Sequence, residues 1–327
     1  MRWPRYAMIR LNRRFMKQPL QFILKLMLII IPCFILVVFI VMPQYETEYM
    51  ASLRDKYARV RAIKEPKILL VGGSNVAFGF DSALLEAEMQ MPVVNFGLHA
   101  NLTQAFVSDL LKPHINDGDI IVIAPEYYHY PDQDCDYVLT WLAIENDWPL
   151  FIAAVRAGHL GGLLDAFPTY FHRAMKKFLN ADESPENELS RALFNEWGDY
   201  AVIRPRRVAG AGEANAFIST GLSDYLGAYW NGLNDYVLAR GATLYMSCPP
   251  IVSEGLLVNL DDLQLRLEDG LDFPVISQLA DYVYPLDYFY DTGFHLNDYG
   301  RRVRTEQLAK DLINYFNNDI MSLRGAQ

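Results

Sequence analysis

The longest apolar run in the sequence covers residues 22–42 and contains a single charged side chain, Lys25. A helix of this length spans roughly 30 Å, the thickness of the hydrocarbon core of a bilayer. Lys25 lies near one end of the run, where its ammonium group can reach the head groups, and a membrane helix tolerates Pro32. The run therefore predicts a transmembrane anchor at residues 22–42.

Beyond the anchor, short apolar runs alternate with longer amphipathic stretches. Four short runs are rich in branched residues and end near glycine or proline, as buried parallel strands do. They cover residues 67–71, 93–95, 119–124 and 243–246. The amphipathic stretches predict helices at residues 82–89, 103–111 and 216–240, and after Asn297. Strands that alternate with helices predict βαβ units, and so an α/β domain, at residues 67–320, whose parallel sheet is covered on both faces.

Two segments depart from this alternation. Residues 43–66 are charged and helical in pattern, which predicts a stalk between anchor and domain. Residues 131–213 are too many for a simple crossover, which predicts a helical insert. Its apolar side chains are interpreted as helix faces that pack on the sheet, in preference to a lid or a surface that faces the membrane or a partner. They are Trp141, Leu142, Trp148, Phe151, Leu163, Leu164, Phe167, Tyr170 and Phe171.

The charge distribution predicts how the chain is oriented in the membrane. Residues 1–43 contain seven basic side chains and no acidic one. The positive-inside rule then places residues 1–21 in the cytoplasm and the domain on the outer side. A cleaved signal peptide is the alternative, but the apolar run is long and the residues that follow it, 43–45, offer no small-residue cleavage site. An uncleaved anchor is therefore favoured.

Composition narrows the class of protein. Of 327 residues, 52% are hydrophobic and 21% are charged, which is typical of a globular chain. Without residues 1–43, the chain holds 22 basic and 39 acidic side chains, a balance of −17 that would repel nucleic acid phosphates. Cys33 falls in the anchor, whereas Cys135 and Cys248 could pair in an oxidising compartment or stay unpaired. We exclude nucleic-acid binding and leave the pairing open.

The first segment with candidate chemistry follows the first predicted strand. It reads Gly72-Gly73-Ser74, with Asn75 next. A serine at the carboxyl end of a parallel strand faces the crevice where such sheets bind ligands. Two glycines permit a tight turn into a helix, and the backbone N–H groups after them can face an anion. Ser74 is therefore a candidate nucleophile.

The second segment precedes the last predicted helix and contains Asp291 and His295, with Asn297 as a plausible N-cap. A serine hydroxyl is a poor nucleophile at neutral pH and needs a base. Histidine suits this role because its pKa lies near neutrality, and a carboxylate can orient its ring and stabilise the imidazolium. The pattern predicts a catalytic group of Ser74, His295 and Asp291.

Other sites are less favoured. His99 and His129 each follow a predicted strand, so both could lie near the same crevice. A metal site needs three or four convergent ligands, and no such spacing is present. The Gly72-Gly73-Ser74 turn also lacks the lysine of a phosphate-binding loop. The sequence predicts neither a metal nor a cofactor.

Taken together, these segments resemble the SGNH/GDSL hydrolase superfamily. The resemblance implies that Ser74 is the nucleophile, His295 the base and Asp291 its orienting acid. Asn95-Phe96-Gly97 is similar to the second conserved block, which implies that the N–H groups of Ser74 and Gly97 form an oxyanion hole. The implied fold is a flavodoxin-like three-layer α/β/α sandwich.

The sequence departs from the family pattern at two points. The family places its aspartate three residues before the histidine, whereas four separate Asp291 from His295. Its third block, Gly-x-Asn-Asp, supplies an amide to the oxyanion, but residues 125–129 read Pro-Glu-Tyr-Tyr-His here. Loss of one such donor typically slows turnover about 10²–10³-fold. Asn101 is the candidate substitute.

Within the superfamily, the anchor and the Gly-Gly-Ser-Asn motif are similar to a bacterial cell-envelope subgroup. This subgroup includes accessory proteins of alginate O-acetylation and teichoic acid D-alanylation. The resemblance implies a single-pass protein of the bacterial inner membrane, with its domain in the periplasm. It further implies an esterase or O-acyltransferase that forms an acyl-serine on an acylated envelope polysaccharide, beside a multi-pass membrane O-acyltransferase. The alternative is a non-catalytic subunit that keeps the scaffold to bind or assemble such a complex.

Overall fold

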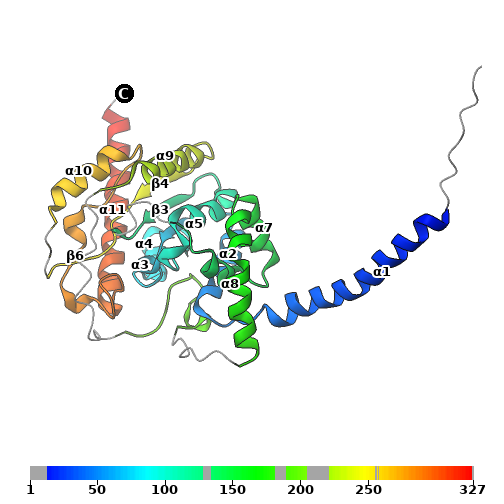
Figure 1. The fold of residues 1–327 in the computed structure, drawn as a ribbon. Coiled ribbons are helices and arrows are strands. Elements are labelled where there is room, and N and C mark those ends of the chain that lie inside the picture. The colour runs from blue at the N-terminus through cyan, green and yellow to red at the C-terminus, as the bar shows by residue number, and fades with distance from the viewer. Residues whose placement is uncertain are drawn as a thin grey trace, which may run out of the picture.

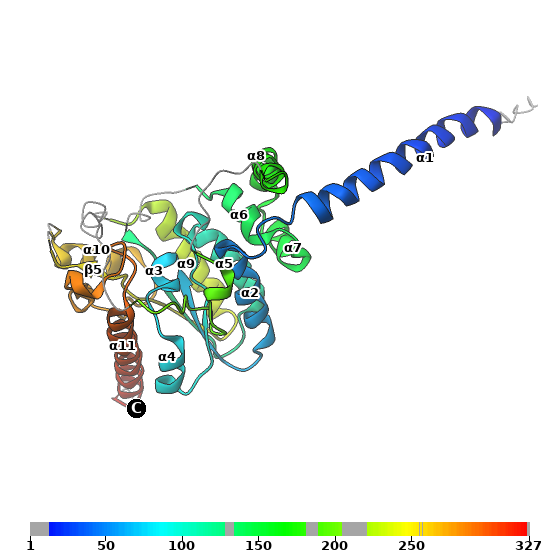
Figure 2. The same cartoon turned by 90° about the horizontal axis from the view of Figure 1, so that it is seen from below.

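The computed structural model describes residues 13–127, 134–180, 189–204, 221–254, 256 and 258–325. Helix α1 (Arg13–Leu36) continues into the π-helical turn η1 (Val37–Val41) and projects away from the domain (Figures 1 and 2). Within it, Gln21–Val41 is long and apolar enough to cross a membrane, and apart from Val41, which is buried against the domain, it is exposed or half-buried. The predicted apolar span is thus one exposed N-terminal helix.

The sheet has four parallel strands in the order β2-β1-β3-β4. They are β1 (Ile68–Gly72), β2 (Val93–Asn95), β3 (Ile120–Ala124) and β4 (Thr243–Met246). These are the four strands that the short apolar runs predicted. A separate parallel pair, β5 (Ile251–Val252) and β6 (Val283–Tyr284), was not predicted because two-residue strands leave no periodic signal.

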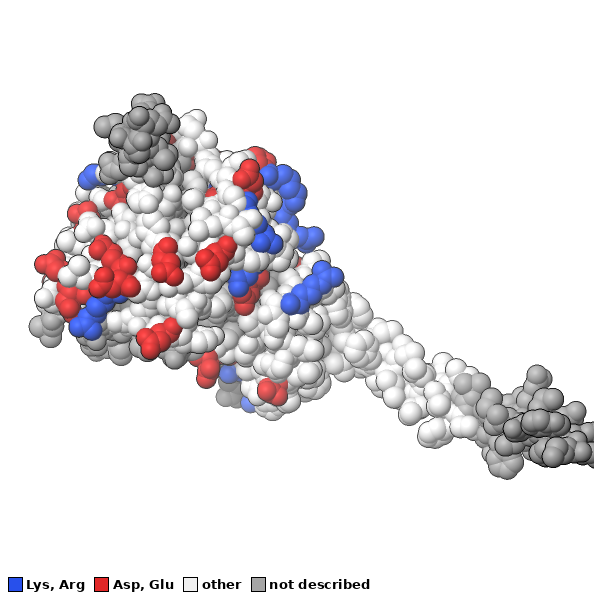
Figure 3. All heavy atoms as spheres, turned by 90° about the horizontal axis from the view of Figure 1, so that it is seen from above, with Lys and Arg blue, Asp and Glu red and all other residues white. Residues whose placement is uncertain are grey.

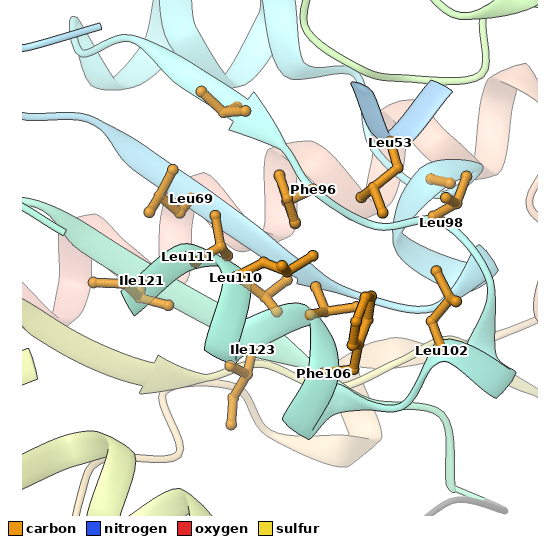
Figure 4. Packing of buried hydrophobic residues seen from close by; sticks show 14 of the residues in the cluster. Leu53, Leu69, Phe96, Leu98, Leu102, Phe106, Leu110, Leu111, Ile121 and Ile123 are labelled. Atoms are coloured by element: carbon orange, nitrogen blue, oxygen red, sulfur yellow. The ribbon is translucent and has the colours of Figure 1, made fainter. Parts of the chain in front are cut away.

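Helices cover both faces of the sheet, as predicted. Alternate residues of β1 face opposite sides, so Leu69 packs on one face and Leu70 on the other, and both are buried. Such two-sided burial explains why the strands are apolar throughout. The first face, shown in Figure 4, is covered by α2 (Leu53–Ala62), α5 (Gln104–Leu111) and α9 (Asp224–Leu238). The second is covered by α4 (Ser82–Met89) and α11 (Asp298–Gly325).

The helix starts follow ordinary capping rules. Asn297 precedes α11, and its Oδ1 accepts the Gly300 N–H at 3.0 Å, which confirms the predicted N-cap. Ser223 caps α9 in the same way, through the Leu226 N–H. The helix was expected from residue 216: residues 216–220 lie outside the described residues, and residues 221–223 are not helical because Ser223 caps the helix at Asp224. Helix α10 (Leu260–Gly270) has Asn259 as its cap.

Residues 43–66, predicted as a stalk, lie within the domain. Four apolar side chains, Tyr49, Leu53, Tyr57 and Val60, are buried in the core. They recur at helical spacing and form one stripe between charged neighbours. The charge of the segment therefore reflects its solvated face, and its apolar stripe makes it part of the fold.

The described part of the insert folds into α6 (Tyr137–Ile144), α7 (Trp148–Arg156) and α8 (Leu160–Phe178). These helices pack mainly on one another and on neighbouring helices, and they do not form a layer directly on the sheet. Trp141 and Tyr170 are buried between α6 and α8, whereas Trp148 and Leu164 are exposed. The interpretation that these faces pack on the sheet is therefore wrong for the described helices: part of the apolar set packs on neighbouring helices, and part is exposed. Cys135 and Cys248 are free thiols.

A buried carboxyl group at the junction with α1 makes stability depend on pH. Glu145 accepts hydrogen bonds from the Tyr45 N–H and the Tyr170 hydroxyl. Burial raises the pKa of Glu145 from 4.5 to about 7, although these two hydrogen bonds and Arg54 oppose the rise. The folded protein therefore binds this proton more tightly than the unfolded chain does.

We expect the protonated Glu145 side chain to stabilise the fold fully below pH 4.5. This contribution to the free energy of unfolding should be lost as the pH rises to 7. The loss is worth about 3 kcal/mol. Glu145→Gln should remove it, so the difference in stability between this variant and the wild type should change between pH 5 and pH 7.5. Urea unfolding of the full chain in detergent micelles measures this. Glu88→Gln, at an exposed position of α4, is the control; an unchanged pH slope in Glu145→Gln would contradict the assignment.

Candidate active site

The candidate site lies at the carboxyl ends of β1 and β3, the adjacent strands between which the chain order of the sheet reverses. In open α/β sheets, this position is where ligands bind. The short helix α3 (Ser74–Ala77) begins directly after β1, and Glu126 follows β3 by two residues. Gly73 fills the turn between strand and helix, where a Cβ atom would lie 2.9 Å from Glu126 Oε1 and 3.0 Å from Ala100 Cα. This turn therefore requires glycine.

The Ser74 hydroxyl is bound by Glu126. Ser74 Oγ donates to Glu126 Oε1 at 3.0 Å, and the same oxygen accepts the Asn75 N–H at 2.9 Å. The side-chain amide of Asn75 donates to the Ala124 carbonyl at 2.9 Å, which ties α3 to the end of β3. Glu126 is 1% exposed. It was not among the predicted site residues, although its place directly after the third strand was a usable signal.

The Asp291 and His295 side chains are joined. His295 Nδ1 lies 2.8 Å from Asp291 Oδ1, and because the carboxylate is the acceptor, Nδ1 carries the proton. Thr292 Oγ1 accepts the His295 N–H, which turns the loop so that a spacing of four residues suffices. The imidazole stacks on the ring of Phe78, with centroids 4.2 Å apart. Phe78 ends α3, so the pair rests on the helix that begins at Ser74.

Nearby charges keep Asp291 ionised. Burial alone would raise the pKa of Asp291, but the hydrogen bond and charge of His295 and the charge of Arg204 hold it below its usual value. The Arg204 guanidinium lies over the rings of Phe78 and Tyr200, at 4.1 and 4.5 Å from their centroids. Burial lowers the pKa of Arg204 to about 10, although Asp291 opposes this. Arg204 still carries its charge at neutral pH and supports the carboxylate.

His99 lies within electrostatic reach of both halves of the site. Burial lowers the pKa of His99; the charges of Glu126 and Asp136 oppose the shift, and that of His295 adds to it. His99 Nδ1 accepts the Asn101 N–H at 3.1 Å, so a neutral His99 carries its proton on Nε2. His99 thus presents a donor, and not a base, to its surroundings at neutral pH.

Of the predicted oxyanion donors, the Gly97 N–H has a hydrogen-bond partner within the domain. The Gly97 N–H donates to Asn95 Oδ1 at 3.0 Å. Gly97 packs directly on α3, because a Cβ atom there would lie 2.5 Å from Val76 Cβ. The Asn101 carbonyl accepts the Asp136 N–H at 2.9 Å, which links this loop to the insert.

The structure therefore brings the predicted residues together in two separate groups. One group joins Ser74 to Glu126, and the other joins Asp291 to His295. Among the described residues, no hydrogen bond connects the Ser74 hydroxyl to His295, Gly97 or Asn101.

For metal binding, the described ranges contain no group of three His, Cys, Asp or Glu placed to hold an ion. His129, one of the two histidines considered at this edge, lies outside those ranges. The hydroxyl, imidazole and carboxyl groups at this edge suit acid–base and acyl-transfer chemistry.

Comparison with known proteins adds no identification. No protein-family model matches the chain. No curated protein sequence matches it either.

Proposed function

We propose that the chain is an extracytoplasmic serine esterase or O-acyltransferase of the SGNH/GDSL type that acts on an acylated cell-envelope polysaccharide. The observation that carries the proposal is the hydrogen bond between Asp291 and His295. The His295 ring stacks on Phe78, and Phe78 follows Ser74 by four residues. Acyl transfer requires a histidine that a carboxylate orients and that can reach a nucleophilic serine, and the Asp291–His295 pair supplies the first part of this arrangement. The strand order β2-β1-β3-β4 is also that of flavodoxin-like sheets.

In the proposed reaction, the Ser74 hydroxyl leaves Glu126 and attacks the acyl carbonyl, while its proton passes to His295. Nε2 of His295 is the acceptor because Nδ1 donates to Asp291. The N–H groups of Ser74 and Gly97 would hold the oxyanion once Gly97 releases Asn95. The tetrahedral intermediate then expels its alcohol, which takes the proton from His295, and leaves an acyl-serine. A sugar hydroxyl resolves this ester in transfer, and water resolves it in hydrolysis.

The cellular setting belongs to the same proposal. Helix α1 would hold the chain in the bacterial inner membrane with residues 1–21 in the cytoplasm, because that end is basic and free of acidic residues. The domain would then face the periplasm, beside a multi-pass membrane O-acyltransferase. Its strongly negative charge excludes nucleic acid as a substrate.

A fluorophosphonate probe tests the chemistry directly, because it phosphonylates activated serines. We expect the full-length protein to be labelled and Ser74→Ala to lose all labelling. Ser253→Ala, at an exposed serine of the same chain, should be labelled like the wild type. Labelling that persists in Ser74→Ala would remove Ser74 as the nucleophile.

One observation favours the second candidate, a non-catalytic subunit that binds or assembles a glycan-modification complex. The Ser74 hydroxyl donates a hydrogen bond to Glu126, and the Gly97 N–H donates one to Asn95. Both groups therefore already have partners within the domain. This candidate predicts unchanged glycan acylation in cells that carry Ser74→Ala or His295→Ala. It also predicts loss of acylation when α1 or the insert is deleted.

A further inference from the structure

Helix α8 has an apolar surface wider than the domain covers. Its buried side, which includes Leu163, Tyr170 and Ala174, packs on the domain. A second apolar stripe lies beside it on the helix and is exposed or half-buried, with Leu164 at 62% exposure. This stripe recurs at helical spacing and comprises Leu160, Leu164, Phe171, Met175 and Phe178. An apolar stripe of this length needs a cover other than water.

Helix α7 extends this surface. Trp148 and Ile152, one helical turn apart, are 48% and 45% exposed. Between α7 and the end of α1 lies an apolar groove of about 620 Å³. Its walls include Cys33, Phe34 and Val37 from the α1–η1 helix and Trp148 and Phe151 from α7. The candidate membrane span is therefore itself one wall of the groove.

The position of these helices fits the surface of a bilayer. Both lie beside the domain end of α1 in the two views of Figures 1 and 2. Helix α8 runs across the direction of α1, so its axis lies along the plane of a membrane that α1 crosses. Because η1 ends at Val41 and contacts α8, the exposed stripe is at the depth of the leaflet next to the domain.

The charge of this region also fits. Residues 148–178 contain four basic side chains, Arg156, Arg173, Lys176 and Lys177, and one acidic side chain, Asp165. Lys177 is paired with Glu48, so the other three basic side chains and Asp165 give this stretch a local balance of +2, in contrast with the acidic remainder of the domain. On the face shown in Figure 3, most of the basic atoms lie in the half nearer α1, with acidic atoms among them, and the surface at the junction is uncharged. Basic residues beside an apolar stripe are typical of helices that lie in the membrane interface and bind anionic head groups.

We infer that the face formed by α7 and α8 lies in the membrane leaflet next to the domain, with a lipid acyl chain in the groove between α1 and α7. The inference rests on α1 as a membrane anchor and is independent of the proposed serine chemistry. Two attachments, the span and this face, would hold the domain in one orientation. The carboxyl edge of the sheet would then stay at a fixed height above the lipid.

Quenching by brominated lipids tests the inference on the full-length chain. The protein is reconstituted in vesicles of phosphatidylcholine with a minor share of phosphatidylglycerol, with or without bromine on the acyl chains. The Trp148 emission, obtained as the difference between wild type and Trp148→Phe, should be largely lost in brominated vesicles. In the Trp148→Phe background, Leu164→Trp should introduce a second quenched component. Leu265→Trp should not, because α10 lies at the end of the domain away from α1 (Figure 1).

The inference is overturned if bromine quenches Leu164→Trp no more than Leu265→Trp. If the Leu164→Trp emission is blue-shifted but unquenched, protein and not lipid covers the stripe, which also overturns it. Extraction at alkaline pH separates this from failure of the anchor, because a chain without a true span leaves the vesicles. Fluorophosphonate labelling of the same samples reports on the proposed function independently.

Discussion

His295→Ala is expected to slow fluorophosphonate labelling of Ser74 on the order of 10³-fold, the usual contribution of a positioned general base. The reason is geometric: His295 donates to Asp291 through Nδ1, which leaves Nε2 to take the hydroxyl proton. The measurement is the second-order rate constant of labelling. His114→Ala is the matched control, because His114 hydrogen-bonds Tyr57 on α2 and is not part of the candidate site.

Glu126→Gln tests whether Glu126, which accepts the Ser74 hydroxyl, is the base in place of His295. A neutral amide oxygen accepts the Ser74 hydroxyl more weakly than a carboxylate does. The variant should therefore release the hydroxyl more readily and label at least as fast as the wild type. If Glu126→Gln abolishes labelling while His295→Ala does not, the carboxylate at the end of β3 is the base, and the serine–histidine–aspartate assignment is wrong.

The four strands of the sheet could be predicted from the sequence because each strand is buried on both faces. The runs at residues 67–71 and 119–124 contain almost no polar position, so their pattern admits few alternatives to a buried strand. The N-cap at Asn297 could also be predicted from the sequence, because a cap depends on a few consecutive residues. Patterns that depend on local residues alone were thus the ones that sequence analysis recovered.

Contacts between distant segments were harder to predict. The hydrogen bond between Ser74 and Glu126 joins residues 52 positions apart and exists because β1 and β3 are neighbours. Sequence patterns place both residues at one edge of the sheet, but they do not specify which acceptor a rotatable hydroxyl selects. The proximity of Asp291 and His295, by contrast, follows from a loop of five residues.

The charged segment at residues 43–66 and the insert show a related limit. In both, apolar side chains are interleaved with charges, and the sequence does not reveal whether protein or another phase covers the apolar stripe. For Leu53 and Tyr57 the cover is the domain core. The domain does not cover Leu164, which is 62% exposed, and we therefore infer that the membrane covers it.

Arg304→Ala is expected to give the largest loss of stability, about 3–5 kcal/mol in the free energy of unfolding. Arg304 is 0% exposed and donates to the carbonyls of Asn75, at 2.6 Å, and Cys248, at 3.2 Å. Its guanidinium also lies over the ring of Phe80. Truncation would leave two buried acceptors unsatisfied and a cavity against that ring. Urea unfolding of the full chain in micelles measures the loss.

The control is Arg302→Ala, on the exposed side of the same helix, where an ion pair with Glu306 is worth about 0–1 kcal/mol. Because the Asn75 carbonyl belongs to α3, Arg304 also positions the turn that carries Ser74. Labelling of the folded fraction of Arg304→Ala should therefore fall as well, whereas Ser74→Ala should lose labelling without losing stability. Equal stabilities for the two arginine variants would show that the buried guanidinium does not hold this turn in place.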